Sequence, residues 1–206
     1  AEENNNKQIK IGIPHTLADD LLEHVVFEAK KTDLLRDLDI SSGWGRSLIQ
    51  QIQEEEIDLA TFMIPSNLRI PPDLLFSKIG TLEFVVVCKR GQAYKYSNFE
   101  KCSKKGWILH PEGCCFRESL AKLLYERNLG FYINREIFGL ELQLLRLPRG
   151  EGLGIFPKPF FDKFSLKNNG LERIELKDFP LHLNVGIVKS QSMDNEKARS
   201  FLEIVK

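Results

Sequence analysis

Two adjacent cysteines, Cys114 and Cys115, are the residues of this sequence whose type and spacing most directly suggest chemistry. They stand at the expected start of a helix, two residues before Arg117. A thiol at a helix N-terminus beside an arginine has its thiolate favoured, and the thiolate is the reactive form. A disulfide with Cys102 would need Cα atoms within about 7 Å. Cys115, Cys114 and Cys102 are therefore redox candidates, and Cys88, in a buried run, is the unreactive comparison.

The spacing of the cysteines and histidines supports neither a zinc site nor a Cys/His hydrolase. The cysteines and His110 lack the paired arrangement of structural zinc sites. A Cys/His hydrolase would need one of the thiols beside His15 or His182 together with an oxyanion hole, and no motif supplies one. We therefore expect no enzyme activity, no metal site and no cofactor.

Composition narrows the function classes further. The 206 residues carry 29 Lys and Arg against 29 Asp and Glu, so bulk positive charge for nucleic acid is lacking. No apolar run approaches the roughly 20 residues of a membrane span, and four cysteines make no disulfide framework. We expect a cytoplasmic protein with reduced thiols and no membrane contact. Residues 1–7 (AEENNNK) are expected to be a disordered N-terminal remnant.

The elements that would position these groups follow from the periodicity of the sequence. Apolar or β-branched runs predict strands at Ile9–Ile13, Leu38–Ser41, Ile57–Ile64, Phe84–Lys89, Trp107–His110, Ile133–Phe138, Gly152–Pro157, Leu171–Lys177 and Leu181–Lys189. Helices are predicted from Thr16, and over Arg46–Glu56, Phe116–Asn128, Gly139–Leu147 and Asp194–Val205, the last capped by Asp194. The strand–helix alternation occurs twice, which is typical of two doubly wound α/β lobes.

Six segments in this order resemble the effector-binding domain of LysR-type transcriptional regulators. They cover residues 9–22 (IKIGIPHTLADDLL), 43–65, 74–91, 107–130, 150–161 (GEGLGIFPKPFF) and 181–205. The resemblance implies a fold like that of type 2 periplasmic-binding proteins. Lobe I would be residues 8–83 plus 187–206 and lobe II residues 84–186, joined by two crossing strands near Phe84 and Leu183.

Three features depart from the family pattern. Pro148 and Arg149 interrupt the path into the Gly-x-Gly segment, Cys114 and Cys115 replace a polar residue, and the N-terminal DNA-binding helix-turn-helix is absent. The chain is thus expected to be a regulatory fragment that contacts DNA only through the absent domain. Cys115 stands where the peroxide-sensing members carry their reactive cysteine, but Leu124 takes the place of their resolving cysteine.

The resemblance also implies that a small effector binds in the crevice between the lobes, beyond the carboxyl ends of the strands, to control DNA binding. Helix starts at Thr16, at 43–46 and at 114–117 would direct amides and positive dipole ends toward it, which suits a small anionic metabolite such as a carboxylate. The predicted ligand-binding residues are Pro14, His15, Thr16, Gly43, Trp44, Gly45, Pro65, Cys114, Cys115, Phe116, Phe138 and Gly139.

Several interpretations stay open. His15 is either a ligand residue or an exposed turn residue, and Trp44 either covers the crevice or anchors its loop. Gly152 and Gly154 indicate close strand–helix packing rather than ligand contact. A solute-binding protein of a transporter, which shares the fold, and a thiol redox sensor using Cys115 are the alternatives to an effector sensor. Cysteine usage favours a regulator over a transport protein.

Association is a further implication of the resemblance. Such domains form a homodimer or a higher homo-oligomer by pairing side by side and antiparallel. The first helix of one copy would face the second lobe of its neighbour. Its apolar surface is formed by Leu21, Leu22, Val25 and Val26.

Overall fold

The computed structural model describes residues 8–16, 38–65, 69–166, 170–179, 181–193 and 195–205. The chain divides into two compact units, unit 1 (residues 1–80 and 184–206) and unit 2 (residues 81–183). Strands β4 (Leu74–Lys89) and β9 (His182–Ser190) run from one unit into the other. Each unit combines helices with strands, which confirms the predicted α/β class.

The sheet of unit 1 places three strands with their carboxyl ends at one edge. Its order is β2 (Leu38–Gly43), β1 (Ile9–Pro14), β3 (Leu59–Pro65), β9 and β4. β1 is parallel to both neighbours, with Pro14 opposite Gly43 and Gly12 opposite Ala60. The residues that follow β1 and β2 therefore leave the sheet side by side.

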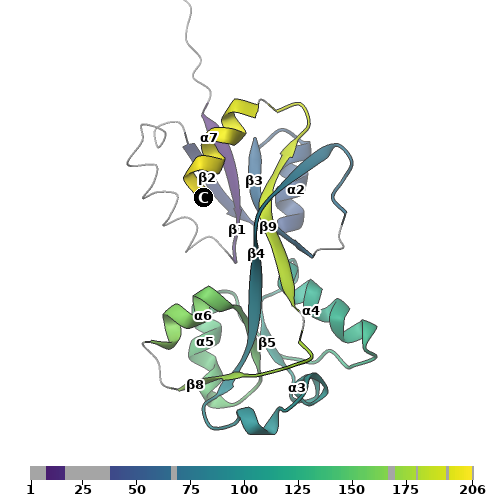
Figure 1. The fold of residues 1–206 in the computed structure, drawn as a ribbon, viewed down its shortest axis with the longest axis vertical. Coiled ribbons are helices and arrows are strands. Elements are labelled where there is room, and N and C mark those ends of the chain that lie inside the picture. Colours follow the sequence, from purple (N-terminus) through teal and green to yellow (C-terminus); the bar gives the residue numbers. More distant parts are fainter. Residues whose placement is uncertain are drawn as a thin grey trace, which may run out of the picture. The chain divides into compact units, whose positions relative to one another are not determined.

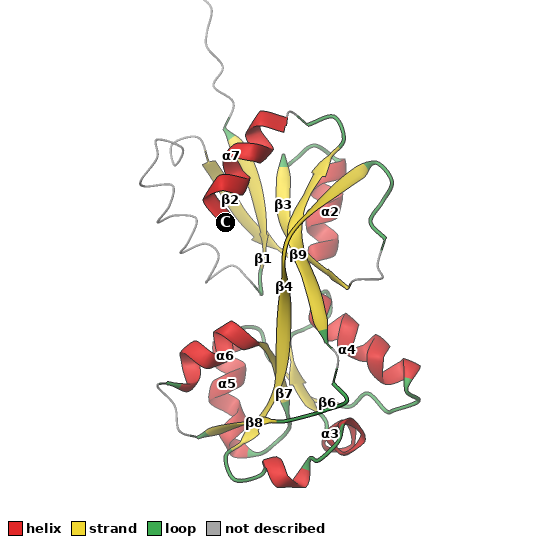
Figure 2. Ribbon diagram, in the orientation of Figure 1, coloured by secondary structure: helices red, strands yellow, loops and turns green. Residues whose placement is uncertain are grey.

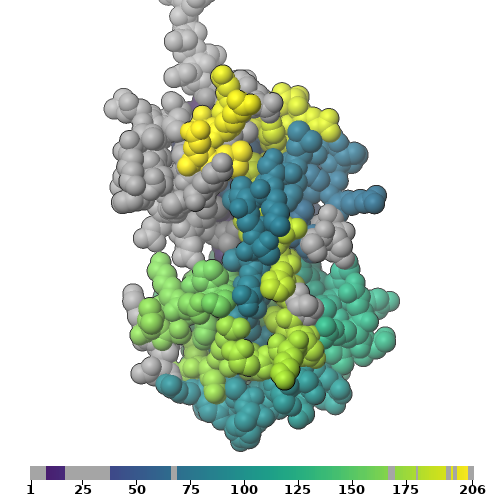
Figure 3. All heavy atoms as spheres, viewed as in Figure 1, coloured from purple at the N-terminus to yellow at the C-terminus, as the bar shows by residue number. Residues whose placement is uncertain are grey.

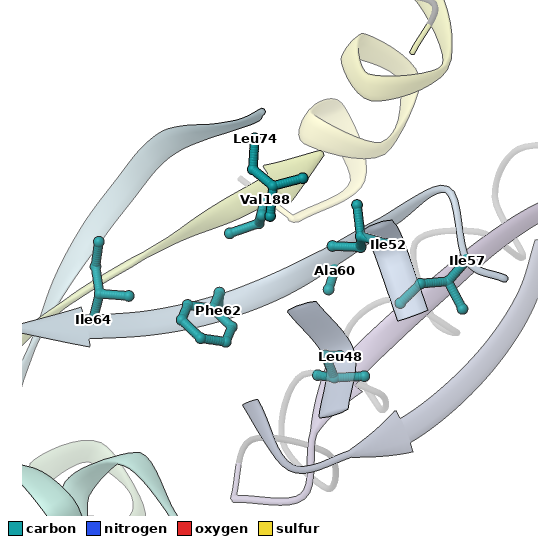
Figure 4. Packing of buried hydrophobic residues seen from close by; sticks show 8 residues of the cluster. All are labelled: Leu48, Ile52, Ile57, Ala60, Phe62, Ile64, Leu74 and Val188. Atoms are coloured by element: carbon teal, nitrogen blue, oxygen red, sulfur yellow. The ribbon is translucent and has the colours of Figure 1, made fainter. Parts of the chain in front are cut away.

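Two apolar clusters cover opposite faces of this sheet, with α7 (Asn195–Val205) on one face and α2 (Gly45–Gln53) on the other (Figure 1). The α7 cluster contains Ile9, Ile11, Ile13, Leu59, Ile187 and Phe201. The α2 cluster contains Leu48, Ile52, Ile57, Ala60, Phe62, Ile64, Leu74 and Val188 (Figure 4). β3 supplies residues to both, because successive side chains of a strand point to opposite faces.

Three of the predicted features lie outside the described residues. These are the remnant at residues 1–7, the helix after Thr16 with its apolar surface at Leu21, Leu22, Val25 and Val26, and the cap at Asp194. α2 ends three residues before the predicted Glu56. Periodicity predicted only the second half of β4, whereas the family resemblance had assigned residues 74–91 to a crossing strand; Figure 3 shows atoms of the first half (blue) at the surface in that view. The residues in the first half of β4 are mostly exposed or half-buried, and apolar and polar side chains do not alternate along it, so periodicity could not indicate a strand there.

Unit 2 is built around two small groups of strands. β4 pairs antiparallel with β7 (Gly154–Pro157) and with β8 (Leu171–Ile174). β5 (Trp107–Leu109) and β6 (Ile133–Glu136) form a separate parallel pair in which Leu109 lies opposite Glu136. The helices are α3 (Phe99–Lys105), α4 (Cys115–Glu126), α5 (Leu140–Arg146) and α6 (Lys158–Ser165), with 3-10 turns at Ala93–Lys95 and Leu147–Arg149 (Figure 2).

Local differences from the predicted elements have physical reasons. α5 stops at Arg146, and Pro148 is accommodated in a 3-10 turn before β7, because proline cannot continue the α-helical hydrogen bonding. α3 and α6 were not predicted. A side chain at Gly154 would lie 2.4 Å from Phe156 and one at Gly152 would lie 3.1 Å from Ile108, so both positions pack closely, as predicted.

Candidate functional site

In unit 1 the predicted residues gather where β1 and β2 end. The His15 N–H donates to the Gly43 carbonyl over 3.0 Å, which ties the two strand ends together. The rings of His15 and Trp44 meet edge to face with centroids 4.7 Å apart. Both side chains are half-buried, and burial lowers the pKa of His15. The structure thus places His15 and Trp44 against each other as a partly buried aromatic pair.

Thr16 follows directly and is 8% exposed. Its Oγ1 is buried and has no hydrogen-bond partner in the part of the chain that the structure describes. A buried hydroxyl without a partner costs free energy, and such groups are uncommon in native proteins. The hydroxyl is therefore a donor that a ligand would satisfy.

The start of α2 adds backbone donors at the same edge. Trp44 is the N-cap in extended conformation, and within the described residues no side chain caps the helix through it. The first amides of a helix have no carbonyl partner inside the helix and lie at its positive dipole end. Gly45 is required by packing, since a Cβ there would lie 2.8 Å from Phe62 Cε2. Pro65, at the end of β3, is half-buried.

In unit 2 the corresponding position is the start of α4. Cys114 is the N-cap and is 1% exposed, while Cys115 is half-buried. Phe116 is fully buried, with its ring centroid 5.1 Å from that of Phe84. The first turn of α4 is therefore anchored by an aromatic side chain within unit 2.

The thiols do not have the low pKa that the sequence suggested. Burial raises the pKa of Cys115 well above its ordinary value, and the neighbouring Cys114 and Glu118 raise it further. Burial also raises the pKa of Cys114 to about 12, despite the amides of Phe116 and Arg117 that point at its sulfur. The expectation of a favoured thiolate was wrong in direction, because desolvation outweighs the helix dipole. The roles of these cysteines in ligand binding stay predictions.

The two remaining thiols, Cys88 and Cys102, are buried like Cys114. All four cysteines are free. Burial raises the pKa of Cys102, on α3, to about 12 and that of Cys88, on β4, to about 11. Cys102 is 0% exposed. Low exposure and a high pKa both disfavour thiolate chemistry at Cys102.

The ends of β5 and β6 bring a second set of residues together. His110 follows β5 and is 2% exposed, and its Nδ1 accepts the Gly139 N–H over 3.3 Å. Gly139 is the N-cap of α5 with φ of +103°, a backbone conformation that favours glycine. Phe138 beside it is 54% exposed, so it presents an apolar surface. Phe138 and Gly139 thus lie at the start of α5 rather than in a strand.

Arg117 was expected to stabilise a thiolate at Cys115, but its guanidinium contacts other groups. Its Nη1 donates to the His110 carbonyl and to Glu136 Oε2, each over 2.7 Å. His110 and Glu136 were missing from the predicted ligand-binding set. The sequence did place His110 at the end of a predicted strand, where functional residues gather, but Glu136 was expected inside the strand Ile133–Phe138 and only the structure ends β6 at Glu136.

The described residues contain no group of three or more His, Cys, Asp and Glu residues placed to hold a metal ion. Among the described helices, none is long and apolar enough to cross a membrane.

Comparison with known proteins places this geometry in a family. The model of the LysR substrate binding domain matches residues 2–206. No curated protein sequence matches the chain.

The solved structures similar to the chain include regulatory domains of OxyR proteins. A sulfate-bound mutant of the OxyR2 regulatory domain from Vibrio vulnificus has a TM-score of 0.76 and 20% identity, covering 100% of this chain and 98% of that one. The reduced OxyR regulatory domain from Pseudomonas aeruginosa has a TM-score of 0.77 and 18% identity, covering 97% and 95%. A mutant of full-length OxyR from Pseudomonas aeruginosa has a TM-score of 0.80 and 18% identity, covering 100% and 71%. The fold is therefore the type 2 periplasmic-binding-protein-like fold predicted from the sequence.

Proposed function

The chain belongs to the LysR substrate binding domain family, and from that premise we propose that it senses a small anionic metabolite for a LysR-type transcriptional regulator in the cytoplasm. Effector binding would control DNA binding by an N-terminal helix-turn-helix in the full-length regulator. The family is a regulatory domain of transcription factors, so we propose no enzyme activity. We assign lobe I to residues 8–83 plus 187–206 and lobe II to residues 84–186.

The observation that carries the anionic class is the donor set at the ends of β1 and β2. It consists of the buried Thr16 hydroxyl and the first amides of α2. Helix N-termini bind anions through exposed amides and the dipole. Pro14, His15, Gly43, Trp44, Gly45 and Pro65 are proposed to surround the ligand.

The second proposed set of ligand residues lies in unit 2. It comprises Cys114, Cys115 and Phe116 at the start of α4 and Phe138 and Gly139 at the start of α5. The two cysteines contribute as small, protonated side chains, which is consistent with their raised pKa values. That the two sets serve one ligand stays a prediction.

Calorimetric titration with sulfate and a panel of small mono- and dicarboxylates tests the proposal. Thr16→Val keeps the shape and removes the hydroxyl, so affinity for the anion that binds should fall about tenfold or more, as for a lost hydrogen bond to a charged group. Thr61→Val is the matched control, because Thr61 on β3 is also buried, and its Oγ1 too lacks a partner in the described residues. Equal affinity in the two variants would remove Thr16 from the site, and no binding by any anion would overturn the anionic class.

Association is proposed to use α5. Leu142 and Leu145, three residues apart on α5, are 58% and 56% exposed and share one face of the helix. LysR-type regulators are oligomeric, and contiguous exposed apolar surface marks interaction sites. We assign this face to a second copy of the chain, in a homodimer or a higher homo-oligomer.

Sedimentation at micromolar concentration tests this assignment. Leu142→Glu should weaken self-association about tenfold or more, because it buries a charge in the interface. Leu166→Glu is the control, since Leu166 is 87% exposed and lies after α6, away from the α5 face in sequence. A monomeric wild type, or a Leu142→Glu variant that associates like wild type, would contradict it.

A further inference from the structure

One buried imidazole in unit 2 touches both helix starts of the proposed second set. His110 Nδ1 accepts the N–H of Gly139, the N-cap of α5, over 3.3 Å. Its ring meets Phe116 of α4 edge to face at 5.7 Å and Phe138 at 5.9 Å. Movement at the start of α4 therefore reaches the start of α5 through a single side chain.

The backbone of His110 is held from the α4 side. Arg117 Nη1 donates to the His110 carbonyl and to Glu136 Oε2, each over 2.7 Å. The Arg117 side chain is 11% exposed and that of Glu136 is 50% exposed, so the bond to the His110 carbonyl is partly buried and the bond to Glu136 is open to water. Charge-assisted bonds of this kind are shorter and stronger than neutral ones. Arg117 thus joins the first turn of α4 to the ends of both β5 and β6.

The start of α5 is held by the same group of contacts around His110. The Gln143 N–H donates to the Gly139 carbonyl over 3.1 Å, and Gln143 Nε2 donates to the Ile137 carbonyl over 2.9 Å. Gln143 is 0% exposed. Gly139 is thus held through its amide by His110 and through its carbonyl by α5. The residues whose exposed side chains form the proposed association face, Leu142 and Leu145, follow on the same helix.

We infer that His110 is a positioning residue that couples the start of α4 to the association face of α5. The biological role of this coupling rests on the proposed function. An effector bound at Cys114–Phe116 would shift Phe116, and His110 would transmit the shift to Gly139. The coupling itself is a property of unit 2 and is measurable without a ligand.

The hydrogen bond between the Gly139 N–H and His110 depends on the protonation state of the imidazole. Nδ1 accepts the Gly139 N–H only while it keeps its lone pair, so a proton there would break the bond. The charged groups around His110 are Arg117, on its carbonyl, and Glu136, paired with Arg117. Glu118 and Glu141, in the first turns of α4 and α5, are exposed, and the two thiols at the start of α4 stay protonated. The coupling should therefore weaken in acid.

Amide hydrogen exchange measured by NMR tests the inference on the whole chain. His110→Phe keeps an aromatic ring but removes the acceptor, so the Gly139 amide should exchange about fivefold to tenfold faster, as for one lost hydrogen bond. His110→Asn places a carbonyl oxygen near the Nδ1 position and should restore protection. In wild type, protection corrected for intrinsic exchange should also fall at pH values where His110 is protonated, whereas in His110→Asn it should not.

Controls separate coupling from general damage. Amides of the β4–β8 ladder in the same unit should be unchanged in each variant. Arg117→Met should also speed exchange at Gly139, whereas Arg135→Met, which removes an exposed ion pair with Glu151, should not. Self-association should weaken in His110→Phe and recover in His110→Asn.

Two results would overturn the inference: unchanged Gly139 exchange in His110→Phe, or exchange in His110→Asn as fast as in His110→Phe. Failure of the proposed function looks different. No anion would bind and no dimer would form, while the exchange results at Gly139 would still hold.

Discussion

The two helix starts, α2 in unit 1 and α4 in unit 2, occupy equivalent places after parallel strands but treat their polar groups differently. Around α2, the described residues leave the Thr16 hydroxyl without a partner and the helix without a side-chain cap. Around α4, the described residues likewise provide no side-chain cap, but the Arg117 guanidinium is bound to the His110 carbonyl and to Glu136.

We interpret this difference as a difference in role: the start of α2 binds the ligand, and the start of α4 transmits a shift to neighbouring elements. An unpaired buried hydroxyl costs stability, and the Thr16 hydroxyl, unlike that of Thr61 within β3, lies at a strand end beside the first amides of α2. Hydrogen bonds between neighbouring elements, such as those of Arg117 and His110, instead hold these elements together. The α2 start thus has the features of an anion subsite, and the α4 start has those of a coupling element. The following predictions test this contrast.

The largest expected effect is on the anchor of α4. Phe116→Ala should lower the free energy of unfolding by about 3–5 kcal/mol, because it empties a fully buried site beside Phe84. Trp44→Ala at the start of α2 should cost less, since the indole is only half-buried. Urea denaturation followed by circular dichroism gives both values. Equal losses would show that the two starts are anchored alike.

A smaller loss is expected where α2 packs on β3. Gly45→Ala puts a methyl 2.8 Å from Phe62 Cε2, so overpacking should cost about 1–3 kcal/mol. Gly43→Ala is the matched variant, because its nearest neighbour is a flexible Leu48 methyl at 3.2 Å. Thermal melts compare the two. A Gly45→Ala protein as stable as Gly43→Ala would mean that the α2 start is loosely held.

Thr61 tests what an unpartnered buried hydroxyl contributes to stability away from the proposed anion site. Thr61→Val should leave the melting temperature unchanged or slightly raised, because it removes a hydroxyl that lacks a partner among the described residues. Differential scanning calorimetry measures it. A clear loss of stability would show that the Thr61 hydroxyl is satisfied in solution, and it would weaken the same argument for Thr16.

A small pH effect is expected at His15. Burial lowers its folded-state pKa below the unfolded value of 6.5, so folding favours the neutral ring. The associated stability is full above pH 6.5 and is lost as the pH falls through the folded-state pKa. His15→Phe keeps an aromatic partner for Trp44 and should remove this part of the pH dependence. Denaturation midpoints between pH 7.5 and about pH 5 test it, and identical slopes would contradict the assignment.

The smallest expected effect concerns Cys115. Its raised pKa leaves little thiolate near neutral pH. Mild peroxide should therefore leave Cys115 largely unmodified, and it should not form a bond to Cys102, whose pKa is about 12. Mass spectrometry after treatment decides. A disulfide from Cys102 to Cys115 or Cys114 would make the redox alternative the leading function.

Element types were predictable because they depend on residues a few positions apart. The β-branched run at Ile9–Pro14 and the apolar run of β3 both became strands at the predicted places. α3 was missed although its signals are local: Asn98 caps it through the Lys101 N–H at 2.9 Å, and Gly106 ends it with positive φ. α6 was missed because it follows β7 directly after Pro157.

The candidate site was predictable in outline for the same reason. Thr16 and the segment from Gly43 to Gly45 were proposed from expected helix starts, and the structure places them after the ends of the parallel strands β1 and β2; their role in ligand binding stays a prediction. The family pattern added Cys114–Phe116. His110 and Arg117 were misjudged, because their partners, Gly139 and Glu136, lie 29 and 19 residues away in the sequence.

By itself, the sequence determined the α/β class, the positions of the strand ends and the helix starts, because backbone preference and apolar periodicity are local. Only the tertiary structure decided which thiols are buried, which hydroxyl lacks a partner and which group Arg117 binds. Desolvation and hydrogen bonding depend on atoms that distant segments bring together. At Cys115, burial outweighed the helix start and reversed the direction of the pKa shift that the sequence had suggested.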